Sequence, residues 1–277
     1  KMNMSMENKF NDFLSQLKDT NQTLNFFCDF DKISENVRNI ELSLNTLNYL
    51  LGKDDIEQAV HEIWQRDKRA FEVMDILIAV RDNGKKRIVD SYGNSVLLKD
   101  LFLDEIGVIE FLKQTGLAEL FRNKRIKNLV DYVFGIETGL DSNARKNRSG
   151  FIMEKTIEDI FTRYSIKFKK EVNSSEYPSV ASVLGNDEKR FDFVVEKENI
   201  TYLIEVNFYS GGGSKLNEVA RSYSEIAPKI NSLGNFKFIW ITDGVGWKSA
   251  KNKLQEAFNI IPNIYNLTTI QEFISIL

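Results

Sequence analysis

The stretch that decides the fold is residues 190–208, RFDFVVEKENITYLIEVNF. Two strand-like runs flank a polar turn at 197–199, and this arrangement predicts a β-hairpin. Because side chains alternate along a strand, the second run has one wholly apolar face and carries Glu205 and Asn207 on the other. Asp192 lies between two phenylalanines on the first run and points away from both. We therefore expect the hairpin to bring Asp192 beside Glu205, although twelve residues separate them.

The sequence around this hairpin predicts a sheet covered by helices. A helical apolar pattern follows Ser149, and strand-like and helix-like runs then follow to the last residues. This order favours an α+β or α/β fold class, in which a mixed central sheet is flanked by helices. The expected strands are 167–172, 190–196, 200–208, 236–241 and 264–265, and the expected helices are 214–231, 247–258 and 268–276.

The first half of the chain has a different pattern. Apolar residues recur there at spacings of three and four, and the first of the three prolines is Pro178, so nothing interrupts long helices. We expect a mostly helical region over 1–140 and the sheet-containing core over 141–277. The expected helices are 6–18, 33–51, 54–66, 68–80, 100–121 and 123–138, with a small hairpin over 87–98.

Composition restricts the chemistry. The single cysteine (Cys28) and the single histidine (His61) exclude a zinc cluster and leave no evident nucleophile–base pair, so a hydrolase must use carboxylates and a hard cation. A net charge of −3 excludes a uniformly basic DNA-binding surface, although a local basic patch lies between Arg122 and Arg148. There is no apolar run of membrane-spanning length and no secretory signal, so we expect a cytoplasmic protein without membrane contact.

Two converging carboxylates are typical of a magnesium site. Mg²⁺ takes oxygen ligands, commonly one or two carboxylates with waters and substrate phosphates, and it lowers the pKa of bound water. We expect Asp192 and Glu205 to lie on a solvent-facing edge and to bind the ion there. On the acid pattern alone, an ordinary solvated hairpin with acids on its outer face is the favoured reading.

The flanking sequence resembles the DpnII/MboI family of type II restriction endonucleases, and the acid spacing resembles the PD-(D/E)XK nuclease motif. The similar stretches span about 120 residues in matching order. They are NLVDYV (128–133), GLDSNARKNRSG (139–150), EVNFYSGGGSKLNE (205–218), ARSY (220–223) and WITDGVGW (240–247).

This resemblance implies a Mg²⁺-dependent enzyme that recognises GATC in duplex DNA and cuts before the G, leaving 5′-phosphates. It implies that adenine methylation blocks cleavage, so that an adenine methyltransferase is the functional partner in the same restriction–modification system. Carried over by position, Asp192 and Glu205 are the metal-binding acids. Asn207 occupies the position of the motif lysine, which leaves open which group assists the attacking water.

Other residues are candidates for the remaining roles. Lys215, which follows the glycine-rich turn, is a candidate for the missing cation, and Glu154 for a further acid on the helix before the sheet. The backbone of the turn could also approach a phosphate, and the basic loop could contact phosphates or base edges, since arginine pairs with guanine and asparagine with adenine. The turn is Ser210, Gly211, Gly212, Gly213 and Ser214, and the loop is Arg145, Lys146, Asn147 and Arg148. Each residue has an ordinary structural reading: a tight turn, a surface lysine, a solvated acid or a solvated basic segment.

Two other functions fit the same residues. One is a repair or recombination nuclease that recognises DNA structure, and the other is a non-catalytic DNA-binding module, which the absent motif lysine would favour. A palindromic site presents the same surface twice, and the chain contains one such hairpin without an internal repeat. We therefore expect a homodimer on DNA, with the helical region as dimer surface, DNA clamp or both. Trp240 and Trp247 are expected in the core.

Overall fold

The computed structural model describes residues 4–141 and 152–277. These residues divide into two compact units. The core unit is formed by two segments of the chain: the residues up to Thr23, and the described residues from 152 to Leu277. The helical unit begins at Leu24, between these two segments. Within the described ranges, no helix has both the length and the apolar character that crossing a membrane requires.

The core unit is built on a five-stranded sheet in the order β3-β4-β5-β6-β7. The first three strands are antiparallel neighbours and the last two join in parallel, so the sheet is mixed, as predicted. The predicted hairpin is confirmed, with Phe193 paired to Ile204 and Val195 to Tyr202. The strands are β3 (Lys169–Asn173), β4 (Arg190–Glu196), β5 (Thr201–Phe208), β6 (Phe236–Asp243) and β7 (Ile264–Tyr265).

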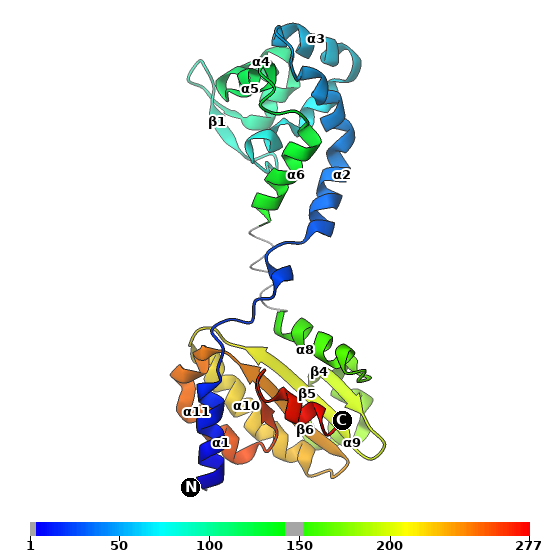
Figure 1. Ribbon diagram of the computed structural model, residues 1–277, viewed down its shortest axis with the longest axis vertical. Coiled ribbons are helices and arrows are strands. Elements are labelled where there is room, and N and C mark those ends of the chain that lie inside the picture. Colours follow the sequence, from blue (N-terminus) through cyan, green and yellow to red (C-terminus); the bar gives the residue numbers. More distant parts are fainter. Residues whose placement is uncertain (1–3, 142–151) are drawn as a thin grey trace. The chain divides into compact units, whose positions relative to one another are not determined.

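Helices cover both faces of this sheet (Figure 1). One face packs against α1, α9, α10 and α11, and the other against α8 and α12. Leu203 therefore lies in one apolar cluster and Ile204 in the other, which confirms the predicted helix-flanked sheet. The helices are α1 (Met4–Ser15), α8 (Ile152–Arg163), α9 (Pro178–Leu184), α10 (Ser214–Asn231), α11 (Lys251–Ile260) and α12 (Ile270–Ile274), with 3₁₀ turns η5 (Ser174–Glu176) and η6 (Val245–Ala250).

The first helix belongs to the core unit. The rings of Phe10 and Phe13 lie 5.1 and 5.0 Å from that of Phe258 on α11. Just after the helix, the Lys18 amide donates to Asp243 Oδ1 at 2.9 Å. This arrangement differs from the expected division into 1–140 and 141–277, because an amphipathic stripe does not specify which of two cores it will join.

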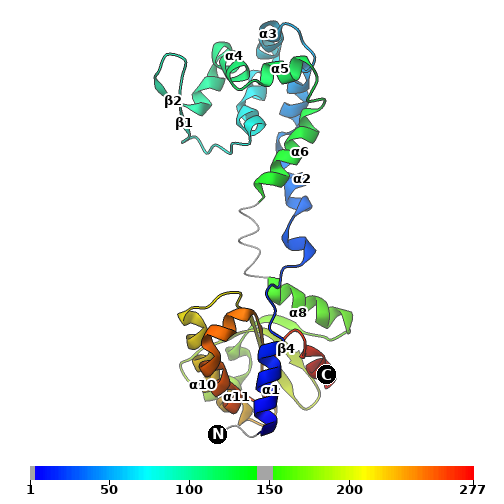
Figure 2. The same cartoon turned by 60° about the vertical axis from the view of Figure 1, so that its left-hand side comes forward.

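The helical unit packs around a core of its own, and α2 lies along α6 (Figure 2). A two-stranded hairpin of β1 and β2 projects from it at the predicted position. Its elements are α2 (Phe30–Leu47), α3 (Ile56–Asp67), β1 (Arg87–Val89), β2 (Ser95–Leu97), α4 (Glu105–Gln114), α5 (Leu117–Arg122) and α6 (Leu129–Leu140), with 3₁₀ segments η1 (Leu24–Phe26), η2 (Asn48–Leu50), η3 (Lys68–Ile78) and η4 (Leu98–Leu103).

Two predicted segments differ from the structure, and one helix was not predicted. The expected helix over 100–121 is broken, because Asp104 caps α4 by accepting from the Gly107 amide at 2.6 Å and Gly116 has a φ of 83°. The expected helix over 68–80 is the 3₁₀ segment η3. The short helix α9 was not expected, and it begins at Pro178, whose fixed φ suits the first helical position.

Candidate active site

The hairpin brings the two predicted acids together. Its register, continued from Phe193 and Ile204, places Asp192 opposite Glu205 on neighbouring strands. The Asp192 carboxylate also accepts from the backbone amide of Val206 at 2.8 Å, which fixes its position against β5. The carboxylates are therefore held side by side by strand pairing rather than by loops.

Glu205 is buried, with 3% of its surface exposed. The expectation that both acids lie on a solvent-facing edge is therefore wrong for Glu205, because α10 and its apolar cluster cover that face of the sheet. Burial, followed by repulsion from Asp192, raises the pKa of Glu205 well above its ordinary value, and Lys189 opposes this shift. Asp192 itself is half-buried. A buried like-charge pair of this kind is costly unless a cation compensates it.

Lys189 provides a positive charge that the sequence analysis missed. Its ammonium forms an ion pair with Glu205 and lies 5.2 Å from the centre of the Tyr223 ring. Its backbone is held at both polar groups, since the amide donates to Ser174 Oγ at 3.0 Å and the carbonyl accepts from the Ser174 amide at 2.7 Å. Lys189 was missed because it belongs to the charged run at 187–190, which looks like an ordinary solvated segment before a strand.

Asn207 lies beside the acids, but its side chain is already engaged. Its Oδ1 accepts from Trp240 Nε1 at 3.1 Å and from the Thr242 hydroxyl, and its Nδ2 donates to the Tyr223 hydroxyl at 3.4 Å. Trp247 Nε1 extends the network by donating to Thr242 Oγ1 at 2.8 Å. Trp240 and Trp247 are fully buried, which confirms their predicted place in the core.

Two further acids lie near Asp192. Glu154, on α8, has a pKa raised by partial burial and then by the charges of Asp192 and Glu171. Glu171 has a φ of 54°, which interrupts the regular geometry of β3. The residues before and after it, Lys170 and Val172, pair with Phe193 and Phe191, so Glu171 lies opposite Asp192. The Glu171 carboxylate forms an ion pair with Arg190 at 2.5 Å. Glu154, Glu171 and Asp192 therefore lie within electrostatic reach of one another, and Lys170 and Arg190 offset part of their charge.

The glycine-rich turn at 210–214 follows the end of β5, and all five of its residues are exposed. It packs against the start of η6, where Gly244 and Gly246 leave no room for a side chain: a Cβ at either position would collide with the carbonyl oxygen of Tyr209. This contact explains why glycines recur at 244 and 246 in the WITDGVGW stretch. Lys215, in the first turn of α10, is exposed, and the structure brings Lys189 rather than Lys215 into contact with Glu205.

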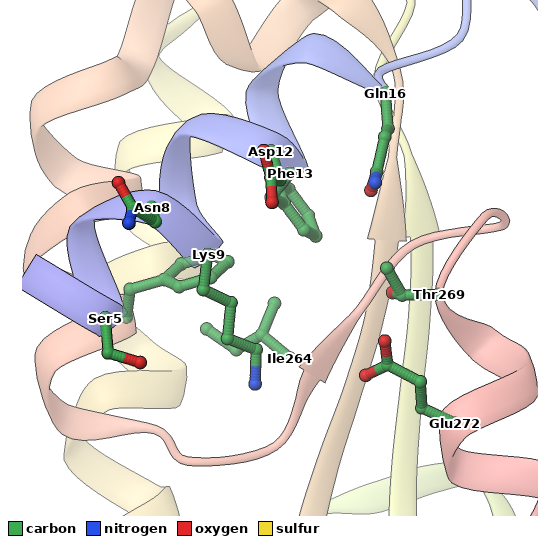
Figure 3. Close-up of a pocket in the computed structure, with 10 residues that line it drawn as sticks. Ser5, Asn8, Lys9, Asp12, Phe13, Gln16, Ile264, Thr269 and Glu272 are labelled. Atoms are coloured by element: carbon green, nitrogen blue, oxygen red, sulfur yellow. The ribbon is translucent and has the colours of Figure 1, made fainter.

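The four predicted DNA-binding residues of the basic loop, at 145–148, lie outside the described residues. A separate cavity of about 400 Å³ lies between α1, β7 and α12 (Figure 3). Its polar lining includes Lys9, Asp12 and Glu272, and none of the predicted site residues borders it. We therefore locate the candidate active site at the acids and not at this cavity.

The donor set at the acids fits a hard divalent cation. Two carboxylates lie on adjacent strands, and Glu205 is buried beside a second negative charge. Oxygen ligands of this kind favour magnesium or calcium over a transition metal. No group of three or more His, Cys, Asp or Glu side chains within the described ranges is arranged to hold a metal on its own. An ion at Asp192 and Glu205 would complete its coordination with water and substrate oxygens, as magnesium commonly does.

Comparison with known proteins gives consistent matches over nearly the whole chain. The family described as DpnII restriction endonuclease matches residues 9–275. The type II restriction enzyme MboI of Moraxella bovis is 53% identical, over 97% of this chain and 96% of that protein. The type II restriction enzyme DpnII of Streptococcus pneumoniae is 38% identical, over 97% of this chain and 97% of that protein. The type II restriction enzyme MjaIII of Methanocaldococcus jannaschii is 41% identical, over 95% of this chain and 96% of that protein. No solved structure matches the chain.

Proposed function

The chain belongs to the DpnII restriction endonuclease family and is therefore a site-specific deoxyribonuclease of type II, and we propose that it hydrolyses duplex DNA at unmethylated GATC with Mg²⁺. The observation that carries the catalytic part is the pair of carboxylates at Asp192 and Glu205. Glu205 is buried beside a second acid, and a bound divalent cation would offset the cost of placing two carboxylates together.

Asp192 and Glu205 would hold the metal. When bound, Mg²⁺ would lower the pKa of a coordinated water and neutralise charge that develops on the scissile phosphate. Asp192 is fixed by the Val206 amide, and Glu205 lies opposite it on β5, so strand pairing already brings the two carboxylates together. Glu154 is our candidate for a further acid, because it lies within electrostatic reach of Asp192.

The proposed reaction is the hydrolysis of one phosphodiester bond in each strand. The oxygen of a water molecule forms a bond to phosphorus, and the bond between phosphorus and the 3′ oxygen breaks with its electron pair. The 3′ oxygen gains a proton and the attacking water loses one, so the products carry a 3′ hydroxyl and a 5′ phosphate. Asn207 has a positioning role in this scheme, because its network ties the end of β5 to β6 and α10.

We assign DNA contacts to two segments of the core. The turn at 210–214 and Lys215 are exposed directly after β5, where backbone amides at the start of α10 can approach a phosphate. The loop residues Arg145, Lys146, Asn147 and Arg148 remain our candidates for base contacts, because arginine and asparagine match the major-groove edges of guanine and adenine.

The helical unit is proposed to clamp DNA, to form the dimer surface, or both. Its β1–β2 hairpin supports the first role, since Lys85, Lys86 and Tyr92 are exposed there and Tyr92 is 87% exposed. The Asp82 carboxylate is turned inward, where it accepts from the backbone amides of Gly84, Lys85 and Lys86. The lysine charges are therefore left facing solvent, as a phosphate contact requires.

Digestion of plasmid DNA tests this function. Plasmid from a host without adenine methylation should give discrete fragments whose ends begin with 5′-phosphate-GATC, and fully methylated plasmid should resist. An N6-methyl group removes one donor hydrogen from the edge that identifies adenine. Nicks or smears would indicate a structure-specific nuclease instead, and equal cutting of both plasmids would contradict the proposed specificity. DNA binding without cutting in Mg²⁺ would indicate a non-catalytic module.

The proposed homodimer is tested by sedimentation with a short duplex that contains one GATC. Two protomers should bind one duplex, because a two-fold axis in the protein matches the two-fold axis of the palindrome. A complex of one protomer that cuts both strands without a nicked intermediate would contradict the dimer.

A further inference from the structure

The Lys189 ammonium is held against Glu205, and the backbone of Lys189 is anchored in the core. The side chain joins Glu205 in an ion pair and passes over the Tyr223 ring, while Ser174 holds both backbone polar groups. Ser174 is itself 1% exposed, so the anchor of Lys189 is part of the core. The lysine side chain keeps 25% of its surface exposed, and the ammonium is therefore at the boundary between the buried acids and solvent.

The other polar groups near the acids already have partners. Arg190 pairs with Glu171, and the Asn207 oxygen already accepts from two donors. Among the ion pairs formed within the described ranges, that of Lys189 is the one that reaches Glu205, whereas Lys215 is exposed and forms none. A phosphodiester transition state needs positive charge beside it. Lys189 places such a charge next to the Glu205 carboxylate.

We infer that Lys189 is a catalytic residue of the hydrolysis, and that its ammonium contacts the scissile phosphate and the attacking water when DNA and metal are bound. This inference rests on the proposed function. A cation bound at Glu205 would displace the ammonium from that carboxylate, and the partly exposed Lys189 side chain would then lie beside the incoming phosphate. Lys189 acts there as a fixed positive charge that stabilises the extra negative charge of the five-coordinate phosphorus, and no proton needs to leave it.

The single cysteine of the chain makes a chemical rescue possible. A Cys28→Ser background removes Cys28, and Lys189→Cys then introduces one thiol at the site. Alkylation of this thiol with 2-bromoethylamine forms an S–C bond, releases bromide and produces a side chain with the length and charge of lysine. We expect Lys189→Cys to lower the single-turnover cleavage rate at least about 100-fold, and alkylation to restore it to within about tenfold of the background.

Two controls separate a catalytic role from a structural one. Lys229→Cys in the same background, at an exposed position on α10, should cut at the background rate before and after alkylation. Binding of a GATC duplex in Ca²⁺ and the melting temperature measured in Ca²⁺ should change little in Lys189→Cys, because the bound cation then compensates the acids in place of the ammonium. Parallel loss of cleavage, Ca²⁺-dependent binding and thermal stability would overturn the catalytic role. Lys189→Arg, which keeps the charge, should retain more cleavage than Lys189→Gln.

The outcomes also separate this inference from the proposed function. If the Cys28→Ser background itself fails to cut GATC plasmid in Mg²⁺, the proposed function has failed, and with it the role of Lys189. If the background cuts and Lys189→Cys cuts equally well, only the assignment of Lys189 is overturned. A folded, DNA-binding Lys189→Cys protein that stays inactive after complete alkylation would overturn it as well, because the charge would then not be the missing element.

Discussion

Both units bury acidic side chains, but they compensate the charge differently. In the helical unit, two buried acids each pair with a cation: Asp75 with Lys99 at 3.2 Å, and Glu137 with Arg81. In the core unit, Glu205 lies beside Asp192 on the neighbouring strand, and Lys189 forms an ion pair with Glu205. Burial of an acid is therefore not by itself a mark of function. The mark is a like-charge pair without enough positive charge beside it.

The largest expected effect tests this contrast with matched substitutions. Glu205→Gln should lower the cleavage rate at least about a thousandfold, because a neutral amide is a poor magnesium ligand. Its melting temperature without metal should stay equal or rise, since the change removes a buried charge next to Asp192. Glu137→Gln should have the opposite profile, with cleavage unchanged and an unfolding free energy lower by about 1–3 kcal/mol. Substantial cleavage by the Glu205 variant in Mg²⁺ would refute the site.

The buried amide network of the core unit should matter to both stability and rate. Asn207→Ala leaves Trp240 Nε1 and the Thr242 hydroxyl without their acceptor, which should lower the unfolding free energy by about 1–3 kcal/mol. Cleavage should fall about tenfold, because the end of β5 is less firmly held. Denaturant titration and single-turnover assays measure the two effects, with exposed Asn252→Ala as the control. A stable variant with full activity would show that the network is dispensable.

A charge reversal on the hairpin tests whether the helical unit takes part in DNA binding. Lys85→Glu with Lys86→Glu should weaken binding of cognate and unrelated duplexes alike, and should reduce the dependence of log affinity on log salt by about two, one for each lost phosphate contact. Fluorescence anisotropy at several salt concentrations provides the measurement. Exposed Lys68→Glu, outside the hairpin, is the matched control. Unchanged affinity and salt dependence would remove the hairpin from the interface.

The smallest expected effect is on the pH dependence of stability. The folded pKa of Glu205 is raised, so the native state binds more protons than the unfolded state between the unfolded and folded pKa values. Its contribution to stability is therefore present at low pH and is lost as pH rises from about 4.5 through the folded pKa. The melting temperature of Glu205→Gln relative to the wild type should increase over that window, measured without metal. A constant difference across pH would contradict the raised pKa.

The sequence was sufficient to predict the hairpin and the pairing of Asp192 with Glu205, because strand alternation and a polar turn are local signals. The sequence could not reveal that Glu205 is buried, because the packing of α10 decides whether the polar face of β5 is covered. The sequence did not identify Lys189 for a similar reason. Its role depends on Ser174 and Tyr223, which lie 15 residues before it and 34 residues after it in the chain.

The attachment of α1 to the core unit has a consequence for the order of synthesis on the ribosome. Lys18 bonds to Asp243, 225 residues later, and Phe10 and Phe13 pack on Phe258. The helical unit is continuous in sequence, so its own core is fully synthesised before any strand of the five-stranded sheet. The first helix must wait, with its apolar face uncovered, until the last strands emerge. The core unit is thus completed only after the helical unit during translation.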